Sequence, residues 1–161
     1  MSRPDWDTYF LDIAMAVAKR STCRRVPEGV GAVLVRDKRI LSTGYVGSLK
    51  GQPHCTEVGC MIDEFTKGCR RTTHSEINCI LQAASHGVCI KDSTLYSTMS
   101  PCWDCFKALA NGGVERIVYL TEYRTVLDQK QFAKACGIAF EHVGTAMYRG
   151  IEQPSITERK I

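Results

Sequence analysis

Two short motifs, HSE at residues 74–76 and PCWDC at residues 101–105, constrain the fold of this chain more than any other feature. Each is expected to begin a helix directly after a strand or loop. Cys102 and Cys105 are three residues apart, so on a helix they share one face and can hold one ion. The positive end of a helix favours the thiolate that zinc requires, and His74 can add a nitrogen. Three protein ligands leave a fourth position for water, which is the arrangement of a catalytic zinc site.

Glu76 lies two residues beyond His74, close enough to reach a zinc-bound water without being a ligand. Zinc lowers the pKa of water to about 7, and a carboxylate can then move protons from that water to a nucleobase and to departing ammonia. The combination H-x-E with P-C-x-x-C is the signature of zinc deaminases. Two alternatives exist: Thr73-x-x-Glu76 also fits a capping box, and C-x-x-C alone fits a structural zinc or a redox pair. The conjunction of both motifs favours catalysis.

The rest of the pattern predicts a mixed sheet between helices, in one domain that spans residues 1–161. Apolar spacing and turn residues predict a helix over 6–17 capped by Asp5, a hairpin of strands 29–36 and 39–46, a helix from Thr73, a strand over 94–99, a helix over 101–111, a strand over 116–120, a helix over 127–136 and a strand over 138–143. Residues 47–72 form a long glycine-containing loop that a metal could order, and residues 149–161 form a polar tail.

Nine cysteines in 161 residues are many, and their use depends on the compartment. We find neither a secretory leader nor an apolar run near the roughly 20 residues of a membrane helix, so we expect a cytoplasmic protein without a membrane partner. Thiols stay reduced there and, when clustered, more often bind metal than form disulfides. The formal net charge of +4 suits a small anionic substrate and is weak for a nucleic-acid binder.

Three segments give the chain a family resemblance: THSEINCILQAA at 73–84, TLYSTMSPCWDCFKAL at 94–109 and GYVG at 44–47. Over about residues 21–137 the sequence resembles the deoxycytidylate (dCMP) deaminases, and GQPHCTEVGC before CRRTTHSE is similar to the bacterial and phage branch. The resemblance implies a three-layer α/β/α cytidine-deaminase-like fold with a five-stranded mixed sheet. It also implies that His74, Cys102 and Cys105 bind the catalytic zinc and that Glu76 shuttles protons while dCMP becomes dUMP for thymidylate synthesis.

The same resemblance implies a homohexamer that dCTP activates and dTTP inhibits, with Mg²⁺ as a cation that could accompany the effector. Two positions depart from the family pattern. Ser75 replaces the usual alanine, which is a small change. Val46 replaces an asparagine that contacts the sugar or the regulatory nucleotide, and valine has no hydrogen-bonding side chain. The sequence therefore leaves open whether the effector response is kept.

A second cluster of metal-ligand residues lies in or beside the long loop: Cys23, His54, Cys55, Cys60 and Cys69. A closed structural zinc could order that loop, and the resemblance also implies a second zinc near the active site. The favoured ligands are the four cysteines, with His54 as a substitute. The alternative is that several are buried free thiols, and Cys79, Cys89 and Cys136 are expected in the core.

Candidate substrate or effector contacts come from three segments. Arg24 and Arg25 precede the first strand of the hairpin. Tyr123 and Arg124 follow strand 116–120, where a parallel sheet commonly binds ligands. Tyr45, Val46 and Gly47 of the GYVG segment and Ser100 before the PCWDC motif complete the set.

Three further possibilities stay open. Trp103 could stack on cytosine, although core packing is the favoured role. The whole chain could instead be another zinc deaminase, acting on cytidine, tRNA or single-stranded DNA. It could also be a binding module that zinc stabilises without catalysis.

Overall fold

The computed structural model describes residues 3–123 and 127–144 of the protein, and its centre is a mixed five-stranded sheet. The strand order is β2 (Arg39–Tyr45), β1 (Gly31–Arg36), β5 (Thr94–Met99), β6 (Arg116–Thr121) and β7 (Ala139–His142). Strand β1 runs antiparallel to both of its neighbours, whereas β5, β6 and β7 are parallel to one another. The predicted hairpin and the predicted strands are therefore confirmed.

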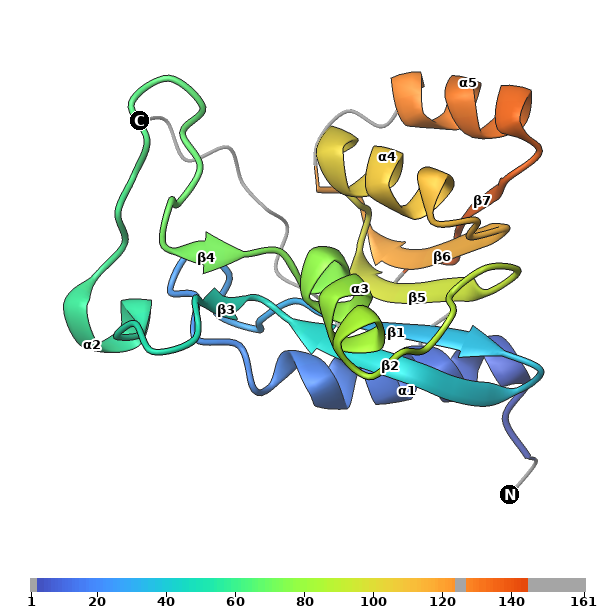
Figure 1. The fold of residues 1–161 in the computed structure, drawn as a ribbon, viewed down its shortest axis with the longest axis horizontal. Coiled ribbons are helices and arrows are strands. Elements are labelled where there is room, and N and C mark those ends of the chain that lie inside the picture. The colour runs from blue at the N-terminus through green and yellow to red at the C-terminus, as the bar shows by residue number, and fades with distance from the viewer. Residues whose placement is uncertain (1–2, 124–126, 145–161) are drawn as a thin grey trace.

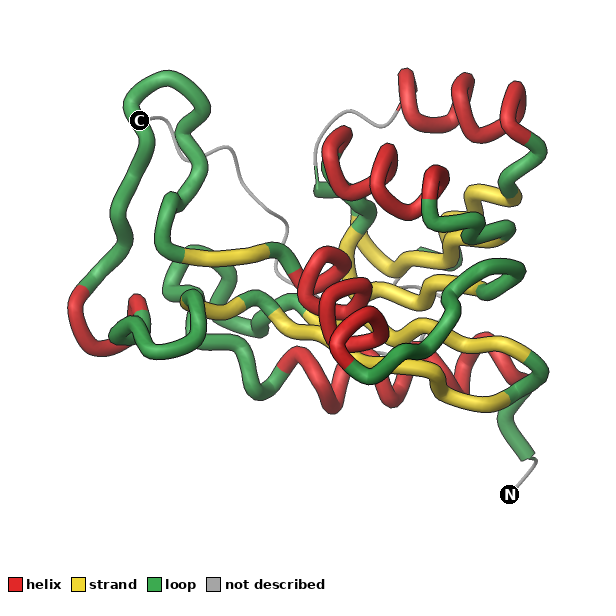
Figure 2. Tube along the Cα trace, viewed as in Figure 1, coloured by secondary structure: helices red, strands yellow, loops and turns green. Residues whose placement is uncertain are grey.

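Helices cover both faces of this sheet (Figures 1 and 2). Helix α1 (Trp6–Ala18) packs on one face, against β1 and β5, and Asp5 caps it by accepting a 2.7 Å hydrogen bond from the Thr8 amide. Helices α3 (Ser75–Ser85), α4 (Trp103–Asn111) and α5 (Leu127–Cys136) lie on the opposite face. This is the three-layer α/β/α arrangement with a five-stranded mixed sheet that the sequence predicted.

Alternating side chains of the strands supply two separate cores. Val33 and Tyr96 pack with Phe10 of α1 on one face. Leu34 and Leu95 pack on the other face, in a cluster with further buried residues that include Cys79, Phe106, Leu109, Ile117 and Tyr119. Successive residues of a strand point to opposite faces, so each buried strand contributes to both layers. This second cluster includes Cys79 and Phe106, and it therefore anchors the two helices whose first turns carry the motifs.

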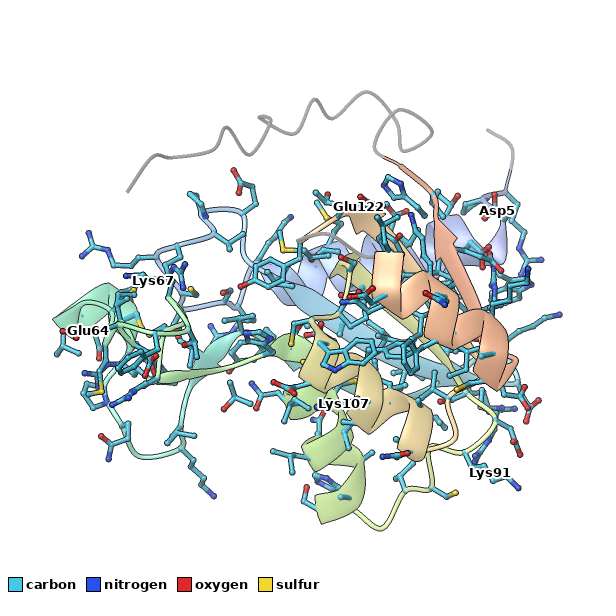
Figure 3. All side chains as sticks on the ribbon, turned by 90° about the horizontal axis from the view of Figure 1, so that it is seen from above. Asp5, Glu64, Lys67, Lys91, Lys107 and Glu122 are labelled. Carbon is cyan, nitrogen blue, oxygen red and sulfur yellow. The ribbon has the colours of Figure 1, made fainter. Side chains whose placement is uncertain are left out.

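The segment between β2 and α3 forms an arm that extends from the sheet (Figure 2). Strands β3 (Gly47–Ser48) and β4 (Thr72–Thr73) pair antiparallel at its base, and helix α2 (Cys55–Val58) and an isolated bridge between Ile62 and Cys69 lie between them. Figure 3 shows Glu64 and Lys67 together on the arm, at the end of the molecule opposite Lys91. The predicted irregular loop is thus an arm with a closed base.

Two expectations need correction, the start of the helix predicted from Thr73 and the burial of two cysteines. Helix α3 begins at Ser75 with His74 as its N-cap, and no side chain caps it, so Thr73 and Glu76 do not form a capping box. Cys79 is buried as expected, but Cys89 and Cys136 are exposed, because the turn and helix end that carry them lie at the surface. Arg124 and the tail 149–161 lie outside the described residues.

Among the helices of the described residues, none is both long enough and apolar enough to cross a membrane.

Candidate metal centre and nucleotide pocket

The starts of α3 and α4 bring His74, Cys102 and Cys105 together. His74 and Cys102 are the N-cap residues of these helices, and Cys105 lies one turn into α4. All ligand atoms of the three side chains lie within 4.8 Å of one another, and Cys105 Sγ is 3.5 Å from His74 Nδ1. Tetrahedral zinc with bonds of about 2.3 Å to sulfur and about 2.0 Å to nitrogen separates such ligands by about 3.5 Å. The three residues therefore fit a zinc ion.

The thiols of this set are prepared for a cation. A hydrogen bond with Cys105, together with the nearby His74, lowers the pKa of Cys102 to about 4 although burial opposes the shift. The pKa of Cys105 is raised because it shares that hydrogen bond and is buried. The two sulfurs also lie at a helix N-terminus, where the helix dipole favours negative charge. This setting favours the thiolate form that a metal ion requires.

Glu76 lies beside the ligand set without belonging to it. Its side chain is buried, with only 3% of the residue exposed, and burial raises the pKa of its carboxyl group. Oε2 accepts a 2.9 Å hydrogen bond from the Ser75 hydroxyl. Burial makes the protonated form of this carboxyl group more favourable than it is in water, and acid–base catalysis requires a group that can both accept and return a proton.

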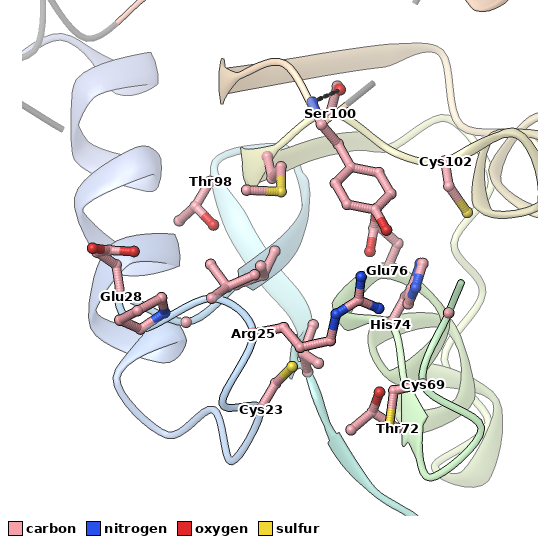
Figure 4. A pocket seen from close by; sticks show the side chains of 18 of the residues that line it. Cys23, Arg25, Glu28, Cys69, Thr72, His74, Glu76, Thr98, Ser100 and Cys102 are labelled. Atoms are coloured by element: carbon pink, nitrogen blue, oxygen red, sulfur yellow. Dashed lines mark hydrogen bonds between the residues drawn. The ribbon is translucent and has the colours of Figure 1, made fainter. Parts of the chain in front are cut away.

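A cavity of about 290 Å³ opens onto this group (Figure 4). His74, Glu76 and Cys102 line one side of it, and Arg25 reaches toward them from the loop that follows α1. Its apolar wall includes Met15, Val30, Val46 and Met99. The volume is close to that of small-molecule sites, and polar side chains, among them Arg25, Thr98 and Ser100, line it beside the apolar wall.

Comparison with known proteins agrees with this geometry. The family described as "Cytidine and deoxycytidylate deaminase zinc-binding region" matches residues 4–121, which include both motifs. The chain belongs to this deaminase family. Membership places it among hydrolases whose shared region binds zinc.

Relatives and solved structures of the family cover most of the chain. Deoxycytidylate deaminase of Mycobacterium phage D29 is 40% identical over 131 residues, which are 76% of this chain and 99% of the phage protein. ComE operon protein 2 of Bacillus subtilis is 38% identical over 144 residues, 89% of this chain and 74% of that protein. The dCMP deaminase of cyanophage S-TIM5, solved in complex with dCMP and dUMP, superposes with a TM-score of 0.73 at 28% identity and covers 88% of this chain and 99% of its own.

Some of the expected substrate contacts of this deaminase line the cavity and some do not. The ones that line it are Arg25, Val46, Ser100 and Tyr123. The amide of Tyr123 donates a 2.9 Å hydrogen bond to Ser100 Oγ, and its ring meets the His74 ring edge-on at a centroid distance of 6.1 Å. The described lining does not include Arg24, Tyr45 or Gly47.

Sequence reasoning missed other lining residues. Thr98 and Met99 end strand β5, next to the ligand set, and Glu28 and Thr72 also line the cavity. The rule that pointed to Tyr123, that ligands bind beyond the carboxyl ends of parallel strands, could have found Thr98 and Met99. Trp103 is not among the lining residues, and its ring packs on Phe106 and Phe132.

Val46 presents only methyl groups to the cavity. Its amide donates to Val30 O at 3.0 Å, and its carbonyl accepts from the Thr22 amide and the Ser21 hydroxyl at 3.2 and 3.0 Å. Its side chain packs with Val30 and Met99. Because both backbone groups are bonded within the protein, a hydroxyl that met this wall would find no partner on Val46.

The arm holds a second group of possible metal ligands, the thiols of Cys55, Cys60 and Cys69, all within 4.8 Å of one another. Cys55 Sγ and Cys69 Sγ are 3.7 Å apart, close to the separation of about 3.8 Å expected for two sulfurs on one tetrahedral zinc. Burial and the neighbouring thiols raise the pKa of Cys55 to about 12. At Cys69, burial favours a higher pKa, but hydrogen bonds donated by the amides of Arg71 and Met61 outweigh it. The pKa of Cys69 is therefore lowered to about 7.

A tight turn keeps Cys60 and Cys69 side by side. Asp63 Oδ1 accepts from the amides of Phe65 and Thr66, and Oδ2 accepts from Arg70 Nε at 2.6 Å. The other two expected ligands lie outside the triad: Cys23 lines the cavity, as Cys69 also does, and His54 precedes α2, where its amide donates to Glu57 Oε2. The structure therefore brings together three of the expected thiols.

Proposed function

We propose that this protein hydrolyses dCMP to dUMP and ammonia at the group formed by His74, Cys102, Cys105 and Glu76. The observation that carries the proposal is that two members of a zinc-fitting ligand set, His74 and Cys102, line one cavity of nucleotide size together with the buried carboxyl group of Glu76. The similarity in fold to the phage deaminase solved with dCMP and dUMP supports the choice of substrate.

The chemistry divides between a metal and the protein. Zinc held by His74, Cys102 and Cys105 supplies an activated water as nucleophile near neutral pH. Glu76 would take one proton from the water and deliver it to N3 of the cytosine as the oxygen bonds to C4. It would then take the remaining proton from the new C4 hydroxyl and transfer it to the amino group, so that the C4–N bond breaks and ammonia leaves. The raised pKa of Glu76 supports this role because burial favours the protonated carboxyl group, which is the form that donates a proton.

Substrate contacts follow from the lining of the cavity. Among the described lining residues, Arg25 is the one arginine or lysine, so we assign it to the 5′-phosphate. Tyr123 and Ser100 close the side next to His74. The apolar wall that includes Val46 suits a deoxyribose, which carries no 2′-hydroxyl.

A second zinc and the regulation are finer parts of the proposal. We assign the second, structural zinc to Cys55, Cys60 and Cys69, with Cys23 as the fourth ligand and His54 as its substitute. Such thiolate sites require a reducing compartment, which supports a cytoplasmic location. Activation by dCTP with Mg²⁺, inhibition by dTTP, assembly as a homohexamer and supply of dUMP to thymidylate synthesis rest on the family resemblance. Arg24, Tyr45, Gly47 and Arg124 are proposed for the effector.

Ammonia release from dCMP, compared with deoxycytidine under the same conditions, tests the proposed reaction. Preferential turnover of dCMP supports both the chemistry and the phosphate contact. If the zinc-loaded protein deaminates only a polynucleotide, the result favours a deaminase that acts on tRNA or single-stranded DNA. If it deaminates no substrate, the result favours a binding module that zinc stabilises.

A further inference from the structure

The residue between the zinc ligand His74 and the proton shuttle Glu76 is itself part of the buried site. Ser75 is the first residue of α3 and has no exposed surface. Its hydroxyl donates a 2.9 Å hydrogen bond to Oε2 of Glu76. Hydrogen bonds from a hydroxyl to a carboxylate are stronger than those between neutral groups, and burial makes the loss of one costly. The contact therefore fixes the carboxyl group more firmly than packing alone.

The orientation of this carboxyl group matters because its terminal torsion is soft. The last torsion of a glutamate is broad and roughly two-fold, so an unrestrained carboxyl group can exchange its two oxygens. A donor on Oε2 restricts that freedom, and the backbone amide of Glu76, which also donates to the carboxyl group, adds to the restraint. With Oε2 held by Ser75, we assign Oε1 to the reactants. Acid–base catalysis is sensitive to such placement, since the proton donor and acceptor have to lie within hydrogen-bond reach.

We propose that Ser75 is a positioning residue for the proton shuttle: its hydroxyl holds Oε2 of Glu76, so that protons pass through Oε1. This inference rests on the proposed deamination, because it assigns Glu76 to proton transfer. Ser75 touches Glu76, and its effect on the reaction is exerted through that carboxyl group. No cap role competes for the hydroxyl, because no side chain caps α3 in the described structure.

The test uses the zinc-loaded full-length protein and its Ser75→Ala and Ser75→Thr variants. Ser75→Ala is expected to lower kcat for dCMP about tenfold, with KM and zinc content unchanged, because the contact serves proton transfer and neither binding nor the metal. Ser75→Thr keeps the hydroxyl and is expected to recover kcat to within about threefold of the parent. A crystal structure of the Ser75→Ala protein is expected to show the Glu76 carboxyl group in more than one orientation.

Ser42→Ala is the matched control. Ser42 is also buried, and its hydroxyl donates a 2.9 Å hydrogen bond to the backbone oxygen of Cys79, one turn along the same helix from Glu76, and not to the Glu76 carboxyl group. This variant is expected to unfold more easily and to keep the parent kcat.

Four results overturn the positioning role. They are a Ser75→Ala kcat within twofold of the parent, an equal fall in Ser42→Ala, a loss of zinc from Ser75→Ala, or a folded Ser75→Thr that is as slow as Ser75→Ala. If the parent itself does not deaminate dCMP, the proposed function fails together with this inference. An active parent with an unaffected Ser75→Ala overturns the inference alone.

Discussion

His74 Nδ1 and Cys105 Sγ lie 3.5 Å apart although 31 positions separate these residues in the sequence. The two residues meet because α3 and α4 both begin at the same side of the sheet, each directly after an extended segment. A ring nitrogen and two sulfurs at this spacing suit zinc and leave room for a water. The candidate metal site is therefore a consequence of where two helices start.

Glu76→Gln is expected to keep zinc and to lose at least about 100-fold in kcat, the usual scale for removing an acid–base group. Glutamine has the same size and can still accept the Ser75 hydrogen bond, but its amide cannot shuttle a proton. Zinc content and ammonia release from dCMP are measured together. Glu115→Gln, at an exposed position, is the control and is expected to behave as the parent. Parallel loss of zinc and activity in Glu76→Gln would show a structural role instead.

Arg25→Met is expected to lower kcat/KM for dCMP by about 10-fold to 100-fold, because a charge-assisted contact to the phosphate is lost. Activity on deoxycytidine, which has no phosphate, is expected to stay unchanged. Arg20→Met provides the control, since Arg20 is an exposed arginine outside the cavity lining. An equal loss on both substrates would remove Arg25 from phosphate binding.

Cys60→Ser is expected to reduce the metal content from two zinc ions to one per chain and to make the arm more sensitive to protease. Tight binding of the ion requires all three thiols of the group, so the loss of one is expected to release the ion. Cys89→Ser replaces an exposed cysteine outside both groups and is expected to keep both ions. Cys23→Ser and His54→Ala then identify the fourth ligand. An unchanged zinc content in Cys60→Ser would exclude Cys60.

Asp7→Asn is expected to destabilise the fold in a pH-dependent way. Arg116 donates to both carboxylate oxygens of Asp7, at 2.8 and 2.7 Å, and this lowers the pKa of Asp7 below 3.8 although burial opposes the shift. A lowered folded-state pKa contributes stability above pH 3.8 that is lost as the pH falls through the folded-state value. The ion pair is partly exposed, so the expected difference at pH 7 is on the order of 1 kcal/mol.

Urea unfolding of Asp7→Asn and the parent, at pH 7 and at pH 3, measures this difference. Acid removes metal from both proteins, so the comparison between them isolates the ion pair. Glu64→Gln, an exposed carboxylate on the arm, is the control and is expected to show no difference at either pH. A gap between Asp7→Asn and the parent that stays constant with pH would contradict the role of the carboxylate charge.

Local pattern was sufficient to predict most of the fold. Strand β5 and helix α5 begin and end at the predicted residues, because apolar spacing and glycine stops specify them locally. Cys89 and Cys136 were misplaced, since a cysteine in an apolar stretch has no feature that separates a core position from a surface one. The arm was predicted as a loop because its short elements depend on contacts such as the Asp63 turn, which no periodicity reveals.

Some residues of the candidate site could likewise be predicted from local sequence, and others could not. The ligands His74, Cys102 and Cys105 could be grouped from spacing, since helix geometry fixes where residues three apart project. Ser75 was judged a small change, because residue identity does not reveal that its hydroxyl reaches Glu76. The expected fourth thiol of the second group, Cys23, lies outside the triad. The sequence could not predict this, because the irregular spacing of those cysteines does not determine which of them meet.

Ammonia release from dCMP, deoxycytidine, CMP and dCTP, measured side by side on protein of known zinc content, tests the proposed reaction and substrate together. We expect dCMP to be turned over preferentially, with activity proportional to bound zinc. Adding dCTP to the dCMP assay shows whether an effector response persists with Val46. Failure of the zinc-loaded protein to release ammonia from any of the four would contradict the assignment.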